Sequence, residues 1–371
     1  MATLSVIGNT LVDTEELQAK RITGELNMPG GQVLRVNNEA ISQNDLTAIQ
    51  LERNFKPIGI GKPMSIEIAT VYIGEYKKFL GGKKDVILVT GVKSSQTFKA
   101  TSRAINMKAD KVEENAYLEF NALEEGTNIV YYTPGMDAEN LIASFELMFD
   151  NFDTQIFETL SGLFTSAAGI PVFLPAAPYL LGGSQLVNIG SKLGDALFSG
   201  RPNLSSSIEV KFDSPIIPPT EPREFIICNN NDLDEFKNLK VDLSGTPGNK
   251  KLRLVDKQSG TVYKGKAPYL IILLDGRKRQ DLEGFAPTLA TASLLKKFYG
   301  PEDKTGEVTG ALQDAMKLYN DSIYNRKGQR LKEQLAKYDR DSEEYKKLKS
   351  LYEAYAANIQ TDTFKLPTIT D

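Results

Sequence analysis

The pattern of hydrophobic and polar residues divides the chain into stretches of different character. Residues 1–63 are only partly regular, with short strand-like runs at 4–7 and 33–36. Between these runs, the polar segment 13–20 predicts a single helix. We therefore interpret residues 1–63 as an N-terminal segment.

Residues 64–214 contain short runs rich in β-branched and aromatic residues, separated by turn-rich pieces, which is typical of an antiparallel sheet. Residues 141–149 are ambiguous, because Phe145, Leu147 and Phe149 alternate as in a strand while Leu141 and Met148 also suit a helix. We interpret them as a strand. The other runs lie at 65–73, 85–92, 116–121, 128–132 and 207–212.

A helical pattern interrupts this unit. Apolar residues recur at three- and four-residue spacing first from 152 to 164 and again from 186 to 197, with a bend rich in proline and glycine between them. The pattern predicts a helical hairpin over 151–199, inserted into the β unit.

Residues 215–302 begin with a proline-rich stretch, 215–222, that suits an extended connector. Strand-like runs follow at 225–228, 252–255 and 268–274. We place a domain boundary at the prolines and expect a second, small β-rich unit after it.

Residues 303–371 combine balanced charge with seven-residue apolar patterns, which predicts a pair of helices. Asp341 with Glu344 forms a plausible capping box for the second helix. The apolar positions are Leu312, Met316, Tyr319 and Ile323, then Tyr345, Leu348, Tyr352 and Tyr355.

The sequence thus predicts an α+β protein that is mainly β. Its core would be a β-sandwich with an inserted helical hairpin, followed by a second small β-rich unit and a C-terminal helical pair. The expected divisions are 1–63, 64–214, 215–302 and 303–371.

Composition removes several kinds of chemistry. The 371 residues include no histidine and one cysteine, Cys228, so serine–histidine and cysteine–histidine nucleophiles are excluded, as is a closed structural zinc site. We expect no cofactor, no metal site and no small-molecule ligand. The net charge of −4 offers no bulk attraction for nucleic acid. The N-terminus lacks the basic and apolar regions of a secretory signal, so we expect a cytoplasmic protein.

The most unusual feature is the uncharged segment, residues 159–191, which contains no Asp, Glu, Lys or Arg. It is interrupted by prolines and is not a normal transmembrane helix. Either its tip packs on the protein's own sheet, or it docks to a partner protein, or it contacts a membrane. The candidate interaction residues here are Ile170, Val172, Phe173, Leu174, Tyr179, Leu180 and Leu181.

A second candidate is the basic cluster Arg277, Lys278 and Arg279, which follows the turn signal Asp275-Gly276. It reads either as a solvated hairpin tip or as a docking site for an acidic partner or a lipid headgroup. Elsewhere, Asn230, Asp232 and Asp234 have the spacing of a calcium loop, but the glycine and glutamate that such a loop needs are missing. We expect an acidic surface loop there.

The order of elements from about 66 to 214 resembles the C2-like β-sandwich domains of uncharacterised bacterial proteins. The resemblance implies a fold and no site residue, since the aspartate clusters that bind calcium in many C2 domains have no counterpart at the strand ends. It is carried by I-E-I-A-T-V-Y-I at 66–73, K-D-V-I-L-V-T at 84–90, N-I-V-Y-Y at 128–132 and I-E-V-K-F at 208–212.

For function, we expect a non-enzymatic structural or interaction protein that docks to itself or to other proteins as a homo- or hetero-oligomer. One alternative is a membrane-active protein that inserts the uncharged segment. Another is a hydrolase that uses paired carboxylates and needs no histidine.

Overall fold

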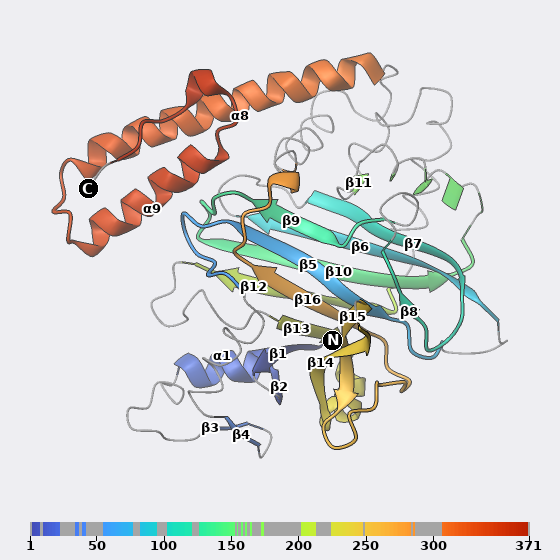
Figure 1. Cartoon of the computed structure of the whole chain (residues 1–371). Coiled ribbons are helices and arrows are strands. Elements are labelled where there is room, and N and C mark those ends of the chain that lie inside the picture. The colour runs from blue at the N-terminus through green and yellow to red at the C-terminus, as the bar shows by residue number, and fades with distance from the viewer. Residues whose placement is uncertain are drawn as a thin grey trace.

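The computed structural model describes most of the strands and the C-terminal helices. The described residues are 2–7, 10–22, 34–36, 39–41, 55–76, 82–94, 102–120, 126–152, 202–212, 224–247, 249–282 and 306–369, with 154, 157, 158, 160, 161, 164, 172, 173 and 285. Two antiparallel sheets form the centre of the molecule, and two long helices lie beside them (Figure 1).

The first sheet has seven strands, and strands from distant parts of the chain lie next to each other in it. Its order is β2–β1–β13–β16–β5–β8, and β9 also pairs with β5. The strands are β1 (Ala2–Ile7), β2 (Thr10–Asp13), β5 (Met64–Tyr72), β8 (Tyr117–Leu118), β9 (Ile129–Thr133), β13 (Glu224–Cys228) and β16 (Tyr269–Asp275).

The second sheet has five strands in the order β11–β7–β6–β10–β12. They are β6 (Lys84–Ser94), β7 (Ser102–Val112), β10 (Asn140–Asp150), β11 (Val172–Phe173) and β12 (Leu204–Lys211). The strand predicted for 141–149 is confirmed as β10, whose buried and half-buried residues alternate from Asn140 to Leu147.

The main core lies between the two sheets. Ile66 and Ile68 of β5 and Leu270 and Ile272 of β16 belong to the same buried cluster as Leu88, Phe145 and Ile208 of the second sheet. Burial of one face of each sheet against the other is what makes the fold a sandwich. The prediction of a mainly β, α+β protein is confirmed.

A polar bridge inside this core ties the two sheets together at one side. Asn106 of β7 is fully buried, and its Oδ1 accepts a hydrogen bond of 2.6 Å from Thr90 Oγ1 on β6. Its Nδ2 donates to the carbonyl oxygens of Thr127, at 3.2 Å, and Ile129, at 2.8 Å. Asn106 therefore joins the second sheet to the chain that enters β9 of the first sheet.

The structure corrects the domain boundary that we placed at residues 215–222. Strands β13 and β16 follow that boundary, yet they pair with β1 and β5 in the middle of the first sheet. Residues 215–302 therefore do not form a separate β-rich unit. The reason is that the proline-rich pattern indicates an extended chain but carries no information about which strands pair afterwards.

The outer face of the first sheet is also covered. The hairpin of β14 (Leu239–Thr246) and β15 (Asn249–Asp256) packs on it together with the short helix α6 (Leu233–Phe236). Thr70 on β5 donates to the Leu252 carbonyl at 2.5 Å, and the rings of Tyr72 and Tyr269 are 5.3 Å apart within this second core. Burial on both faces explains why β13 and β16 are continuous apolar runs.

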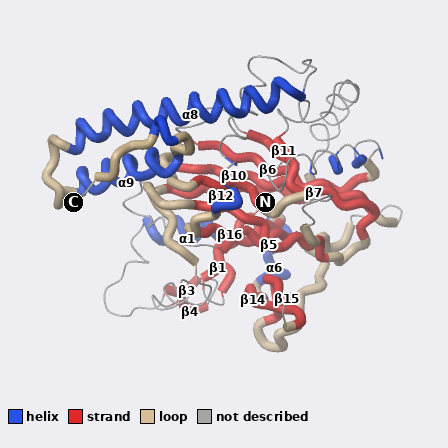
Figure 2. The backbone as a smooth tube through the Cα atoms, turned by 45° about the horizontal axis from the view of Figure 1, so that its top comes forward, coloured by secondary structure: helices blue, strands red, loops and turns tan. Residues whose placement is uncertain are grey.

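The C-terminal helical pair, hereafter the helix pair, consists of α8 (Gly306–Leu335) and α9 (Glu343–Asn358). Both lie beside the strands in the two views (Figures 1 and 2). The cap of α9 is Ser342, whose Oγ accepts the Tyr345 amide at 3.2 Å. The capping box predicted with Asp341 is therefore wrong by one residue.

Smaller elements are α1 (Thr14–Ile22), β3 (Leu34–Val36), β4 (Glu39–Ile41), and the 3-10 turns η1 (Asn230–Asp232), η2 (Gln280–Leu282) and η3 (Asp362–Phe364).

Three contacts hold the helix pair on the end of the sandwich. The Nδ2 of Asn358 donates to the Gly135 carbonyl at 2.7 Å, and its Oδ1 accepts from Thr133 Oγ1 at 3.0 Å. A Cβ on Gly135 would lie 2.7 Å from the Cα of Ala354. The helix and the loop between β9 and β10 thus approach each other at backbone distance, which requires glycine.

Candidate interaction surfaces

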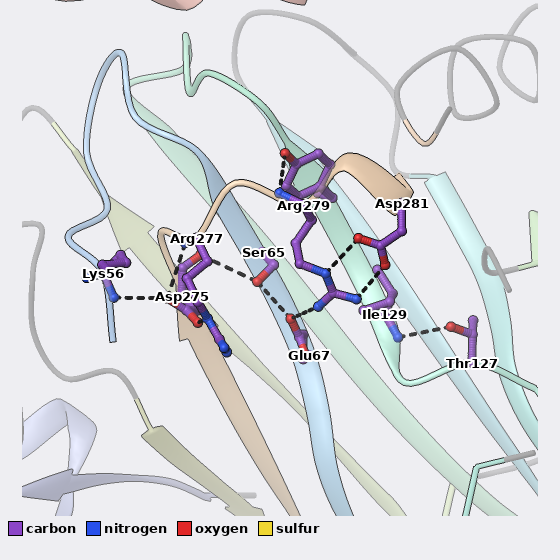
Figure 3. A network of polar contacts seen from close by, with 10 residues as sticks. Lys56, Ser65, Glu67, Thr127, Ile129, Asp275, Arg277, Arg279 and Asp281 are labelled. Carbon is purple, nitrogen blue, oxygen red and sulfur yellow. Dashed lines mark hydrogen bonds and ion pairs between the residues drawn. The ribbon is translucent and has the colours of Figure 1, made fainter. Parts of the chain in front are cut away.

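The basic cluster predicted as a hairpin tip is an ordered turn whose arginines point toward carboxylates. We define the arginine turn as residues 275–281, between the end of β16 and η2. Figure 3 shows that Arg279 lies between Glu67 of β5 and Asp281. Its Nη1 is 3.0 Å from Glu67 Oε1 and its Nη2 is 2.7 Å from Asp281 Oδ2.

The two carboxylates that pair with Arg279 differ in exposure. The Glu67 side chain is 14% exposed, whereas that of Asp281 is 60% exposed. The guanidinium holds the pKa of Asp281 below its usual range, and the hydrogen bond to Asp281 raises the pKa of Arg279. The Arg279 amide also donates to the Tyr132 hydroxyl at 3.0 Å. Arg279 therefore anchors the turn on β5 and β9.

Arg277 and Lys278 behave differently from Arg279. The guanidinium of Arg277 pairs with Asp275, whose side chain is 3% exposed, while the Arg277 side chain is 59% exposed. Asp275 also accepts the Lys56 amide at 3.0 Å. Lys278 is exposed. Of the three basic residues predicted to dock a partner, two are thus bound to internal carboxylates, and Lys278 is the one that points its charge at solvent.

Most of the uncharged segment lies outside the described residues, including Ile170, Leu174, Tyr179, Leu180 and Leu181. Residues 154–164 are helical where they are described, as predicted for the first arm of the hairpin. Val172 and Phe173 form β11, which pairs with Ile105 and Ala104 of β7 at the edge of the second sheet. At these two residues the uncharged segment adds a strand to the protein's own sandwich.

Among the described residues, no helix is long and apolar enough to cross a membrane. The same residues hold no group of three or more Cys, Asp or Glu side chains arranged for a metal ion. Asn230, Asp232 and Asp234 lie in η1 and α6, where Asn229 Nδ2 donates to Asp232 Oδ2 at 3.1 Å. The calcium spacing therefore corresponds to a short helical surface turn.

The sequence pattern missed a surface on α8. The helix pair is antiparallel, since the carboxylate of Asp321 accepts the amides of Gln360 and Thr361, just beyond the end of α9. Residues 306–320 consequently extend past α9, as Figure 1 shows. We call this part of α8 the projecting half. At its end, Leu318 is 48% exposed and Tyr319 is 58% exposed.

The two halves of α8 present different faces to their surroundings. Tyr324, Leu331 and Leu335 contact the residues of α9 and the C-terminal segment. Tyr319 precedes Tyr324 by five residues, which at 3.6 residues per turn places it about 140° away around the helix axis. Of the apolar positions that the sequence shows on this helix, Tyr319 therefore does not lie on the face that α9 covers. On α9 the predicted stripe is buried at Tyr345, Tyr352 and Tyr355.

No protein-family model, curated protein or solved structure matches the chain significantly.

Proposed function

We propose that this chain is a non-enzymatic interaction protein that assembles with a second copy of itself through the projecting half of α8. The observation that carries the proposal is the exposure of Leu318 and Tyr319 on a part of α8 that α9 leaves uncovered. Exposure of two adjacent large apolar side chains to water is unfavourable in free energy, and docking against a partner removes that exposure.

The sequence around these residues favours a second copy as the partner. The apolar stripe that runs along the projecting half and continues one turn beyond it is Leu312, Met316, Tyr319 and Ile323. In paired helices, the charges of the residues that flank such a stripe determine which partner the helix accepts. Here they are Gln313, Ala315, Asn320 and Ser322, none of which is charged. Two copies therefore meet without like-charge repulsion.

The other expected features of the protein belong to this proposal. We interpret the sandwich as C2-like, because its two antiparallel sheets contain the runs that carried the resemblance. We place the protein in the cytoplasm, where a single reduced cysteine, here the buried Cys228, is ordinary. Internal pairing of Arg277 and Arg279 argues for the helix, rather than the arginine turn, as the docking surface.

The test is the mass in solution by light scattering, for the wild-type chain and two matched variants. Tyr319→Glu places a charge on the proposed interface, and Tyr338→Glu places the same charge on a residue that is 47% exposed in the connection between α8 and α9. We expect a dimer for the wild type and Tyr338→Glu, and a monomer for Tyr319→Glu. A wild-type monomer at high concentration overturns the proposal, as does a dimer that Tyr319→Glu leaves intact.

The same samples are mixed with anionic liposomes, because the alternative of membrane contact through 159–191 predicts co-sedimentation. Binding to liposomes by a monomeric wild-type chain supports that alternative. A dimer that stays in the supernatant supports the proposal.

A further inference from the structure

A buried carboxylic acid lies under the helix pair. Asp137 is in the loop between β9 and β10, and its residue is 4% exposed. Its Oδ2 has no hydrogen-bond partner among the described residues. An unsatisfied buried carboxylate oxygen is unusual in a folded protein and calls for a physical explanation.

The groups that surround Asp137 come from three elements. Tyr131 lies on β9, Tyr324 and Lys327 lie on α8, and Tyr355 lies on α9. The rings of Tyr324 and Tyr355 are 5.8 Å apart, and the Lys327 ammonium is 5.9 Å and 5.1 Å from their centroids. Asp137 therefore sits where both helices meet the sandwich.

Burial makes the charged form of Asp137 unfavourable. Removal from water raises the pKa of its carboxyl, and the nearby Lys327 charge offsets part of that effect. The neighbouring phenols show the same environment, since burial and the Asp137 charge raise the pKa of Tyr355 to about 12. Asp321 faces Tyr324 from the same helix and adds negative charge to this region.

The helices create this environment. Gly135 and Asn358 hold α9 against the loop that carries Asp137, and Gly61 approaches the same helix so closely that a Cβ would lie 2.5 Å from the Ser350 carbonyl oxygen. Separation of the helix pair from the sandwich returns Asp137 to water. Docking of the helices and protonation of Asp137 are therefore thermodynamically linked.

We infer that Asp137 is a proton-operated latch: as the neutral acid it lets the helix pair sit on the sandwich, and its ionisation loosens that docking. The inference is independent of the dimer proposed above, because it concerns the covered half of α8 and not the projecting half.

The direction of the pH effect follows from the linkage. In the docked state the pKa of Asp137 is above its ordinary value of 3.8, and after separation it returns toward that value. At a pH between these two pKa values, the docked state therefore binds more protons than the separated state. Docking is strongest below the ordinary pKa and weakens as the pH rises through the raised pKa.

The experiment is amide hydrogen exchange of the full chain, read by mass spectrometry from about pH 4, just above the ordinary pKa of 3.8, to about pH 8, with exchange times corrected for the intrinsic rate. The reporter is α9, Glu343–Asn358, and the internal reference is β10, Asn140–Asp150. In the wild type we expect protection of α9 to fall with rising pH by up to about tenfold per pH unit, relative to β10.

Two variants separate the latch from general effects of charge. Asp137→Asn removes the ionisation, so its α9 protection should not change with pH. Asp341→Asn removes the same charge from an exposed position before α9 and should keep the wild-type curve. Lys327→Met removes the charge that favours the carboxylate and should move the loss of protection to a different pH, an effect that a merely structural Asp137 would not show.

Two results would overturn the inference: a wild-type α9 whose protection follows that of β10 at every pH, or an Asp137→Asn variant with the wild-type pH dependence. If Asp137→Asn does not fold, the wild-type comparison of α9 with β10 still decides the matter.

Discussion

The polar bridge at Asn106 allows the sharpest prediction about what holds the sandwich together. Replacing Asn106 with alanine removes three hydrogen bonds, from Thr90 and to the carbonyls of Thr127 and Ile129. Each buried polar group left without a partner costs about 1–3 kcal/mol. The Thr90 hydroxyl can rotate toward another acceptor, so we expect a loss of about 3–5 kcal/mol, against a total stability of about 5–15 kcal/mol for a typical domain.

The assay is urea unfolding followed by far-ultraviolet circular dichroism, since the chain has no tryptophan to serve as a fluorescent probe. The matched control is Asn203→Ala. Asn203 accepts the Phe149 amide through an exposed hydrogen bond of 2.8 Å at the edge of the same sheet. Its loss should cost about 1 kcal/mol or less, because water replaces it. A cost below about 1 kcal/mol for Asn106→Ala would refute the reasoning.

Three further predictions follow from contacts described above. Arg279→Met leaves its carboxylate partners unpaired and should lower the free energy of unfolding by about 1–3 kcal/mol in the same urea assay, whereas Lys278→Met should leave it unchanged; equal effects would contradict an anchoring role. Gly61 has a φ of +79°, so Gly61→Ala should cost about 1–3 kcal/mol and reduce hydrogen-exchange protection in α9 before β10. Burial raises the pKa of the Cys228 thiol to about 12; it stays protonated at neutral pH, and a thiol reagent should react with it only along the unfolding curve, so rapid labelling of the folded chain would count against this.

The strands that could be predicted are those with simple alternation or continuous apolar residues. β10 was found because Phe145, Leu147 and their neighbours alternate. β7 was missed, since its buried positions include Asn106 and Lys108, which hide the apolar periodicity. Asn106, which joins the two sheets, is thus also one of the residues that conceal the strand from a hydrophobicity pattern.

Long-range pairing was beyond the reach of the sequence pattern. The runs that became β13 and β16 were recognised as strands, but nothing in them indicates that they lie between β1 and β5. Hydrogen bonding between strands is made by the backbone and is nearly independent of side-chain identity, so local sequence specifies a strand more clearly than its neighbour.

The candidate surfaces also combine features that the sequence shows with long-range contacts that it does not. The arginine turn was visible as a basic cluster, but Glu67, which pairs with Arg279, is far away in sequence. A carboxylate within the apolar run of β5 is a signal that a buried cation lies nearby, and it could have indicated the pairing. Tyr319 was visible as an apolar position of the first C-terminal helix, but only the position of α9 shows that Tyr319 and its neighbour Leu318 are left exposed.

The order of strands in the first sheet has a consequence for how the chain folds during its synthesis. Ser5 of β1 pairs with Phe225 of β13, 225 − 5 = 220 positions later. β5 in turn pairs with β16, which ends at Asp275. During synthesis, β1 and β5 therefore leave the ribosome long before their partners β13 and β16 exist. Such non-local pairing slows folding and leaves unpaired edges open to aggregation. A chain interrupted before residue 224 lacks the two middle strands, and the burden on the cell's chaperones should fall mainly on this unfinished nascent form.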